Sequence, residues 1–150
     1  MKPFNLNFRT MKTVFLSIVL LLSITVSVFA QNKSNVKAEE FEKAIKKKGI
    51  QLLDVRRPAE YEEGHIKGST LANWEDKVEF EKHAQHLDKD KPVYVYCRSG
   101  KRSSAAADYL SEKGFTNVIN LEGGILEWKQ EGKTVETDQK SQTAAAVPQH

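Results

Sequence analysis

The residues of this sequence that could do chemistry gather around Cys97, the one cysteine of the 150-residue chain. The loop after it holds three cations, one glycine and two serines: Arg98, Ser99, Gly100, Lys101, Arg102 and Ser103. The glycine lets the backbone turn, so that successive N–H groups can point inward and hold an anion. Cations and N–H donors favour the thiolate, which is the nucleophilic form of cysteine. The loop therefore predicts a reactive thiol with an anion-binding site beside it.

Two other roles for Cys97 are less consistent with these neighbours. A free cysteine is often a small buried hydrophobe, but such a residue would be expected among apolar neighbours and not before a polar, cationic loop. A single cysteine also excludes an internal disulfide framework and a thiolate-rich structural zinc site. The histidines show no recognisable ligand spacing with Cys97; they are His65, His83, His86 and His150. We therefore expect neither a metal nor a cofactor.

Short apolar runs alternate with helical patterns along the chain. The expected helices are residues 35–48, a turn opening at 57–61, and residues 75–87, 103–113 and 124–130. The expected strands are residues 50–55, 69–72, 92–96 and 116–120. This alternation is typical of an α/β fold with a central, mainly parallel sheet flanked by helices on both faces.

The expected elements place Cys97 between the strand 92–96 and the helix 103–113. Ligands of open α/β sheets bind at the carboxyl ends of strands, which is where Cys97 would lie. Ser103 or Ser104 could cap the helix, whose N-terminal partial positive charge would then face the sulfur. The elements thus support the interpretation of Cys97 as a thiolate beside an anion site.

The N-terminal 30 residues are typical of a secretory signal peptide. Lys12 precedes an uncharged apolar run at 14–29, and Ala30 supplies the small residue at the break, so cleavage is expected before Gln31. The run is shorter than the roughly 20 residues of a comfortable membrane span, although a retained anchor is the competing interpretation. Met11 would itself be a suitable first residue for this signal peptide, so the translation start could lie there. We expect a periplasmic or secreted protein with no stable membrane association after cleavage.

The remaining chain is expected to hold one domain and to be electrically balanced. The chain has 23 Lys and Arg against 20 Asp and Glu, and residues 1–30 hold three of those cations and none of the acids, which leaves 20 against 20. A broad basic face for nucleic acid is therefore not expected. The expected divisions are a linker at 31–34, a folded domain at 35–133 and a disordered tail at 134–150.

Four segments together resemble the single-domain rhodanese family of sulfurtransferases, over roughly residues 36–133. The segments are LLDVR at 52–56, EYEEGHIKG at 60–68, CRSGKRS at 97–103, and VINLEGGI at 118–125 with Trp128. Their order and spacing are much more specific than any one of them alone. The resemblance implies a rhodanese-like fold.

The resemblance also implies a reaction and its participants. Cys97 would take the outer sulfur of a donor, hold it as a persulfide and pass it to an acceptor, while the loop N–H groups and cations would bind the donor. A small dianion such as thiosulfate suits the cationic loop, and the acceptor could be a thiol, cyanide or a protein. Asp54, Glu60 and His65 would support the loops and the sheet edge and not take part in the chemistry.

There are two alternative functions, and the loop disfavours the first of them. Phosphatases and arsenate reductases related to this family place five residues between the cysteine and an arginine, whereas Arg102 stands one position too early here. A shorter loop makes a smaller ring of N–H donors, which fits a sulfur atom better than a phosphoryl group. A persulfide carrier or sensing module that docks to a partner protein would need the same loop as an enzyme, so the sequence does not separate the two.

Overall fold

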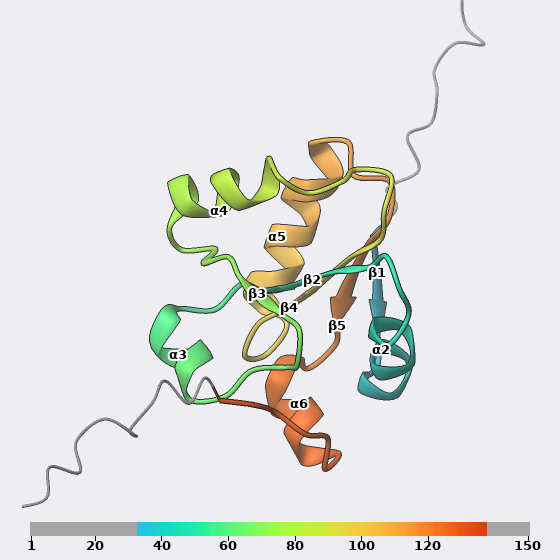
Figure 1. The fold of residues 1–150 in the computed structure, drawn as a ribbon, viewed down its shortest axis with the longest axis vertical. Helices are drawn as coiled ribbons and strands as arrows, with labels where there is room; N and C mark the ends of the chain where they lie inside the picture. The colour runs from blue at the N-terminus through green and yellow to red at the C-terminus, as the bar shows by residue number, and fades with distance from the viewer. Residues whose placement is uncertain (1–32, 138–150) are drawn as a thin grey trace, which may run out of the picture. The chain divides into compact units, whose positions relative to one another are not determined.

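The computed structural model describes residues 33–137 of the chain, so the expected signal peptide at 1–30 lies outside the described residues. The described residues form a five-stranded parallel sheet of order β1-β5-β4-β2-β3 (Figure 1). Its strands are β1 (Lys33–Val36), β2 (Gln51–Asp54), β3 (Thr70–Leu71), β4 (Val93–Tyr96) and β5 (Val118–Leu121). The central strand β4 pairs with β2 and β5, and its carboxyl end leads directly to Cys97.

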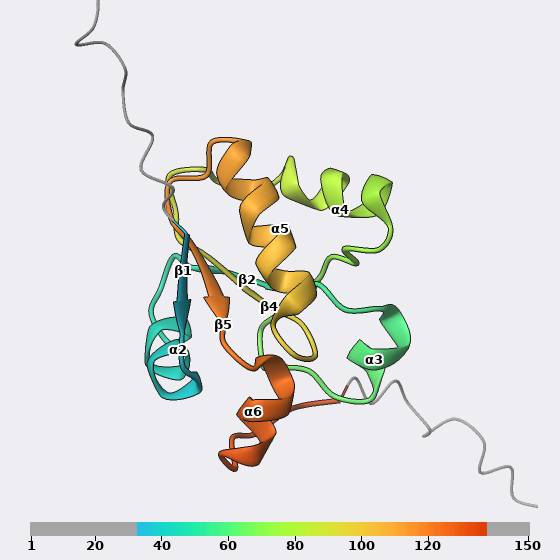
Figure 2. The same ribbon diagram turned by 180° about the vertical axis from the view of Figure 1, so that it is seen from behind.

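Helices cover both faces of the sheet, as Figures 1 and 2 show. The helices are α2 (Ala38–Ile45), α3 (Pro58–Glu62), α4 (Lys77–Ala84), α5 (Lys101–Glu112) and α6 (Gly124–Gln130). Side chains alternate along a strand, so the sheet feeds two cores. Val93 and Val95 join a cluster with residues of α4 and α5. Tyr96 joins a second cluster with Phe41 of α2 and Trp128 of α6. The expected α/β fold, with a parallel sheet between helices, is confirmed.

The first strand was not expected from the sequence. Residues 31–34 were predicted to be a linker and residues 35–48 a helix, but β1 occupies Lys33–Val36 and α2 begins only at Ala38. The strand carries one strongly apolar residue, Val36, because it lies at the edge of the sheet and pairs only with β5. An edge strand needs little hydrophobic pattern of its own, which is why the pattern did not reveal it.

The folded domain also extends past Lys133, where the tail was expected to begin. Glu136 and His65 exchange backbone N–H···O bonds of 2.8 Å. Trp128 donates its indole N–H to the carbonyl of Thr134 at 2.9 Å, and Val135 packs against the core that contains Trp128. Residues 134–136 are therefore part of the fold, and the rest of the expected tail, from residue 138, lies outside the described residues.

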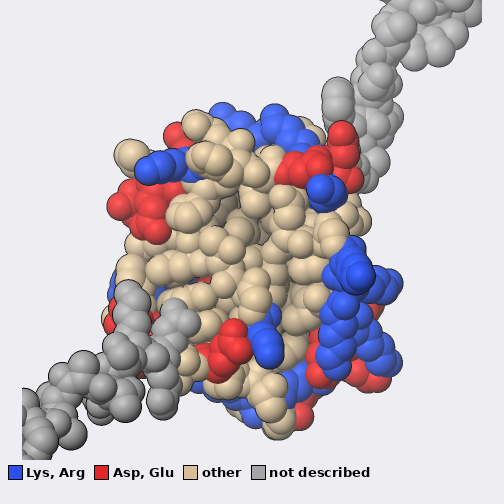
Figure 3. Space-filling model, viewed as in Figure 1, with Lys and Arg blue, Asp and Glu red and all other residues tan. Residues whose placement is uncertain are grey.

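Charged side chains of both signs lie mainly around the rim of the face shown in Figure 3, with a group of positive side chains over α2. Two lysines, one within α2 and one at its C-cap, form ion pairs with glutamates of the same helix. Lys43 contacts Glu39 at 2.7 Å and Lys46 contacts Glu42 at 2.9 Å, each four residues apart. Exposed pairs of this kind contribute little to stability, because solvent and salt screen them.

Candidate functional site

The Cys97 side chain is covered, yet its sulfur has polar neighbours. The residue is 1% exposed and packs in the same cluster as Val95. The backbone N–H of Gly100 donates to Sγ at 3.1 Å, and the Ser103 hydroxyl donates to Sγ at 3.3 Å. Two donors directed at one sulfur stabilise its negative charge in the way that they would stabilise any anion. The sulfur is therefore not surrounded by apolar groups alone, although the residue packs in the core.

The helix after the loop begins earlier than expected, and its cap is different. α5 starts at Lys101 and its N-cap is Gly100, with no side-chain capping bond, so neither Ser103 nor Ser104 is the cap. Gly100 has φ +91°, a left-handed conformation that costs a non-glycine residue roughly 1–2 kcal/mol. This turn brings the Gly100 N–H to the sulfur. It also places Ser103 within the first turn of α5, where its hydroxyl reaches Sγ.

The loop backbone is held from outside by the start of α6. The N–H of Ile125 donates to the carbonyl of Cys97 at 2.9 Å, and the N–H of Leu126 donates to the carbonyl of Arg98 at 3.1 Å. In a planar trans peptide the C=O and the N–H point in opposite directions. The N–H groups of Arg98 and Ser99, which share peptide units with these two carbonyls, therefore point away from α6. The start of α6 thus orients the first half of the loop.

Gly124 makes this contact possible. It has φ +62°, and a Cβ at this position would lie 2.5 Å from the carbonyl oxygens of both Cys97 and Arg98. Real Cβ atoms essentially never approach other atoms within 3.0 Å. A glycine at position 124 is therefore required by the close approach of α6 to the loop.

Arg102 binds carboxylates of two other segments. Its guanidinium donates to both carboxylate oxygens of Glu60 at 2.7 Å and to Glu75 at 3.1 Å. Glu75 in turn accepts two hydrogen bonds from Arg57. The bonds from Arg102 lower the pKa of Glu60 to about 2. This charge network joins α3, the segment before α4 and the first turn of α5, so Arg102 anchors the loop instead of offering a free positive charge.

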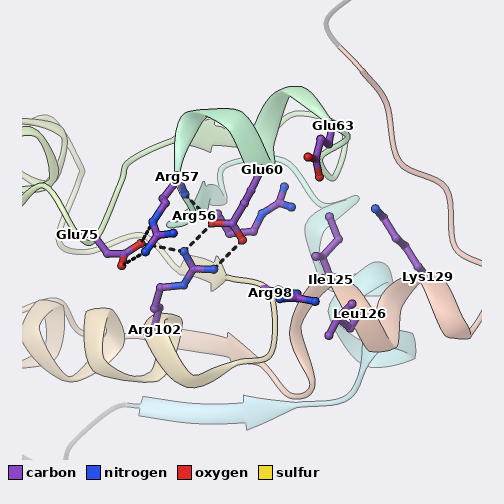
Figure 4. Close-up of a pocket in the computed structure, with 10 residues that line it drawn as sticks. All are labelled: Arg56, Arg57, Glu60, Glu63, Glu75, Arg98, Arg102, Ile125, Leu126 and Lys129. Carbon is purple, nitrogen blue, oxygen red and sulfur yellow. Dashed lines mark hydrogen bonds and ion pairs between the residues drawn. The ribbon is translucent and has the colours of Figure 1, made fainter.

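A cleft of about 610 Å³ lies beside the loop (Figure 4). It is lined by Arg56, Arg57, Glu60, Glu63, Glu75, Arg98, Arg102, Ile125, Leu126 and Lys129. Arg98 is the one loop cation that lines the cleft and has no carboxylate partner among the described residues. Lys101 is exposed on the first turn of α5 and is not among the lining residues. Of the three loop cations, Arg98 and Arg102 therefore line the cleft, and the Arg102 guanidinium is paired with carboxylates.

Of the three expected supporting residues, Glu60 lines the cleft, whereas Asp54 and His65 are buried. Asp54, at the end of β2, is fully buried and forms an ion pair with Arg56, which also donates to the Gly64 carbonyl at 2.8 Å. His65 is buried and its ring stacks on Tyr61 at a centroid distance of 3.7 Å. These contacts tie the segment between α3 and β3 to the end of β2. Neither Asp54 nor His65 lines the cleft.

The structure adds residues that sequence reasoning did not single out as parts of the site. Arg56 forms an ion pair with Asp54. Glu75 forms ion pairs with Arg57 and Arg102. Lys129 lines the cleft from α6. Only proximity in space reveals Glu75 and Lys129, because they lie in segments remote from Cys97 in sequence. Ser99 instead lines a separate hollow of about 300 Å³ together with Gly100.

Within residues 33–137, no cluster of three or more His, Cys, Asp or Glu side chains is arranged to hold a metal ion. A search of the same residues for helices long and apolar enough to cross a membrane also finds none.

Known proteins share this fold and sequence pattern. A family model for the rhodanese-like domain matches residues 37–131. A crystal structure of a rhodanese-related protein from Thermoplasma volcanium superposes with a TM-score of 0.60 at 35% identity, over 69% of this chain and 97% of that one. The described fold is therefore the rhodanese-like one.

Two curated relatives have different named activities. The chain is 38% identical over 85 residues to the thiosulfate sulfurtransferase GlpE of Coxiella burnetii, covering 57% of this chain and 77% of that protein. It is 35% identical over 114 residues to a tRNA uridine(34) hydroxylase of Pelagibacter ubique, covering 75% of this chain but only 38% of that protein. The family match spans most of the described residues, and the chain belongs to the rhodanese-like domain family.

Proposed function

We propose that this protein is a sulfurtransferase that carries sulfane sulfur as a persulfide on Cys97. The observation that supports this most strongly is the sulfur itself, which receives the Gly100 N–H and the Ser103 hydroxyl at the carboxyl end of β4. The similarity to the sulfurtransferase GlpE supports the same reaction class. The preferred donor is a small dianion such as thiosulfate.

The reaction has two balanced steps. The Cys97 thiolate attacks the outer sulfur of thiosulfate, a new S–S bond forms, the original S–S bond breaks, and sulfite leaves with its electron pair. An acceptor, either a thiolate or cyanide, then attacks the outer sulfur of the persulfide. The bond between the two persulfide sulfurs breaks and its electron pair returns to Sγ of Cys97. The charge on sulfur in each state can be stabilised by the same two donors.

The length of the loop argues against phosphoryl or arsenate chemistry, because Arg102 stands one position earlier than the arginine of those related enzymes. The guanidinium of Arg102 is also occupied by Glu60 and Glu75. The covered sulfur also suits a donor whose reacting atom is terminal, since the Cys97 residue is only 1% exposed.

The test is turnover with thiosulfate and cyanide. The purified protein should form thiocyanate repeatedly and should barely hydrolyse an aryl phosphate. Cys97→Ser should abolish transfer and leave the circular dichroism spectrum unchanged, because the hydroxyl is close in size to the thiol. A single turnover that then stops, with both substrates in excess, would favour a carrier or sensing module over an enzyme. Undiminished transfer by the Cys97→Ser variant would overturn the proposal.

The second part of the proposal concerns the localisation of the protein. The basic residue, the apolar run at 14–29 and Ala30 support export with cleavage before Gln31. N-terminal sequencing of the protein from the periplasm or medium should therefore begin at or near Gln31. An intact segment at residues 11–30 would replace secretion with membrane anchoring.

A further inference from the structure

The strand that leads to Cys97 ends in a buried tyrosine. Tyr96 is the last residue of β4 and is 0% exposed. Its side chain packs in the cluster with Trp128, whereas Cys97 packs in the other cluster, with Val95, as expected for neighbouring residues that point to opposite faces of a sheet. Tyr96 therefore holds the backbone of Cys97 from the face of the sheet opposite the sulfur.

The Tyr96 hydroxyl contacts the chain between α3 and β3. It accepts the backbone N–H of Ile66 at 3.0 Å and lies 3.0 Å from Oγ of Ser69, where either hydroxyl can be the donor. Ile66 and Ser69 are themselves buried. Burial and the Asp54 carboxylate raise the pKa of the Tyr96 phenol above its ordinary value of 10.0, so the phenol keeps its proton near neutral pH. In a buried contact of this kind, loss of one partner leaves the other unsatisfied.

The same stretch of chain also binds the other end of the loop. Residues 57–69, which we call the clamp segment, comprise Arg57, α3 and the chain that follows it as far as Ser69. Within this segment Glu60 accepts two hydrogen bonds of 2.7 Å from Arg102, in the first turn of α5 (Figure 4). The Tyr61 hydroxyl donates to the Ser69 carbonyl at 2.8 Å and so ties α3 to the end of the segment. The clamp segment therefore contacts the loop region at both ends, through Tyr96 and through Arg102.

We propose that Tyr96 is a positioning residue for sulfur transfer: its hydroxyl, bonded to the clamp segment, fixes the start of the loop, while Glu60 fixes its end. This inference goes beyond the proposed function and rests on it, since it concerns the thiol that takes the sulfur. The Gly100 N–H donates to Sγ of Cys97 across the loop at 3.1 Å, so this bond depends on the separation of the two ends. Without the phenol hydroxyl, the clamp segment holds only the end of the loop, and the sulfur moves relative to its donors.

Three variants test the role of the hydroxyl. Tyr96→Phe removes the hydroxyl and keeps the ring, and Ser69→Ala removes its side-chain partner. Tyr94→Phe is the matched control, because Tyr94 lies two residues earlier on the same face of β4 and packs against the same cluster. Within residues 33–137 the Tyr94 hydroxyl makes no hydrogen bond. Each purified variant is mixed with thiosulfate in a single-turnover experiment, and the rate at which Cys97 gains sulfur is followed by mass spectrometry.

The expected effects differ in size among the variants. Tyr96→Phe should slow the gain of sulfur about 10-fold, since a displacement of about 1 Å can lower a rate by about 100-fold and the shift here is smaller. Ser69→Ala should slow it about 2- to 5-fold, because the Ile66 N–H still holds the phenol and one hydrogen bond has an effect of this order. Tyr94→Phe should react at the wild-type rate.

The double variant Tyr96→Phe/Ser69→Ala separates positioning from stability. Tyr96→Phe alone leaves the Ser69 hydroxyl buried without this partner, and removal of that hydroxyl as well should raise the urea midpoint toward the wild-type value. The rate of sulfur gain should stay as low as in Tyr96→Phe, because the clamp segment still lacks its bond to β4. A rate that recovers together with the urea midpoint would show that the hydroxyl only stabilises the fold, and would overturn the proposal.

Two further results bear on different claims. If folded Tyr96→Phe gains sulfur at the wild-type rate, Tyr96 does not position the loop and the proposed function stands. Should Tyr96→Phe fail to fold, Ser69→Ala decides the question, and a wild-type rate in that variant would overturn the proposal. If thiosulfate adds no sulfur to Cys97 of the wild type, the proposed function fails and the inference fails with it.

Discussion

Replacement of Gly124 by alanine should damage both the fold and the site. The left-handed backbone at this residue, with φ +62°, costs an alanine roughly 1–2 kcal/mol. The new Cβ would lie 2.5 Å from the carbonyl oxygens of Cys97 and Arg98, and overpacking of this kind costs about 1–3 kcal/mol more. The expected loss in the free energy of unfolding is therefore about 2–5 kcal/mol, a large part of the usual 5–15 kcal/mol.

The same substitution should move the loop that carries Cys97. To bring the contact from 2.5 Å to the 3.0 Å limit, α6 and the loop must separate by at least 0.5 Å. A displacement of about 1 Å in a reacting group can lower a rate by about 100-fold. We therefore expect sulfur transfer to fall about 10- to 100-fold at temperatures where the variant is still folded.

Gly132→Ala is the matched control. Gly132 follows α6 and also has a left-handed backbone, with φ +72°, but a Cβ added there would have no other atom within 4 Å. The free energy of unfolding of this variant should fall only by the cost of a left-handed alanine, roughly 1–2 kcal/mol, and the variant should keep its activity. Urea unfolding and steady-state transfer measure the two effects. Equal losses of stability in the two variants, with activity intact in Gly124→Ala, would refute the argument that Gly124 is required by the loop.

Three further predictions concern the loop and its supports. Ser103→Ala should lower kcat/KM for thiosulfate about 2- to 12-fold, the effect of a hydrogen bond of about 0.5–1.5 kcal/mol, whereas the control Ser111→Ala, which loses only a bond to Ala107, should not. Glu60 has a pKa of about 2 against the ordinary 4.5, so its pair with Arg102 is fully stabilising above pH 4.5 and is lost as the pH falls toward 2. The difference in urea midpoint between wild type and Glu60→Gln should therefore be constant above about pH 5 and shrink below it; a difference that grows in acid would contradict the assignment. Truncation after Lys133 removes the bridge to His65 and the contact of Val135, and should lower the thermal midpoint measured by circular dichroism.

The sequence predicted the central part of the fold because that part is fully buried. β2, β4 and β5 appear in the sequence as short apolar runs, since central strands are covered on both faces. The apolar run before Cys97 was recognised as such a strand, so Cys97 was expected at its carboxyl end. The structure places Cys97 directly after β4. The edge strand β1 was missed, because its central residues are exposed and its sequence, KSNV, has little apolar character.

The site was less predictable where it depends on distant segments. The cations after Cys97 were visible in the sequence, but their pairing was not. Arg102 is held by Glu60 and Glu75, which lie 42 and 27 residues away along the chain. No local pattern encodes such a contact, and so the pairing of Arg102 with carboxylates could not be predicted from the sequence. Gly124 stood out only as part of a family motif, and its physical role became clear from the distance to the loop carbonyls.

The most direct test of the proposed function is the mass of Cys97 after exposure to a donor. The protein is incubated with thiosulfate, separated from it, digested without reductant, and its Cys97 peptide is analysed by mass spectrometry. We expect a gain of one sulfur atom on that peptide, which cyanide removes with formation of stoichiometric thiocyanate, and no gain in Cys97→Ser. An unmodified Cys97 peptide in the folded wild-type protein, with sulfite absent from the medium, would contradict it.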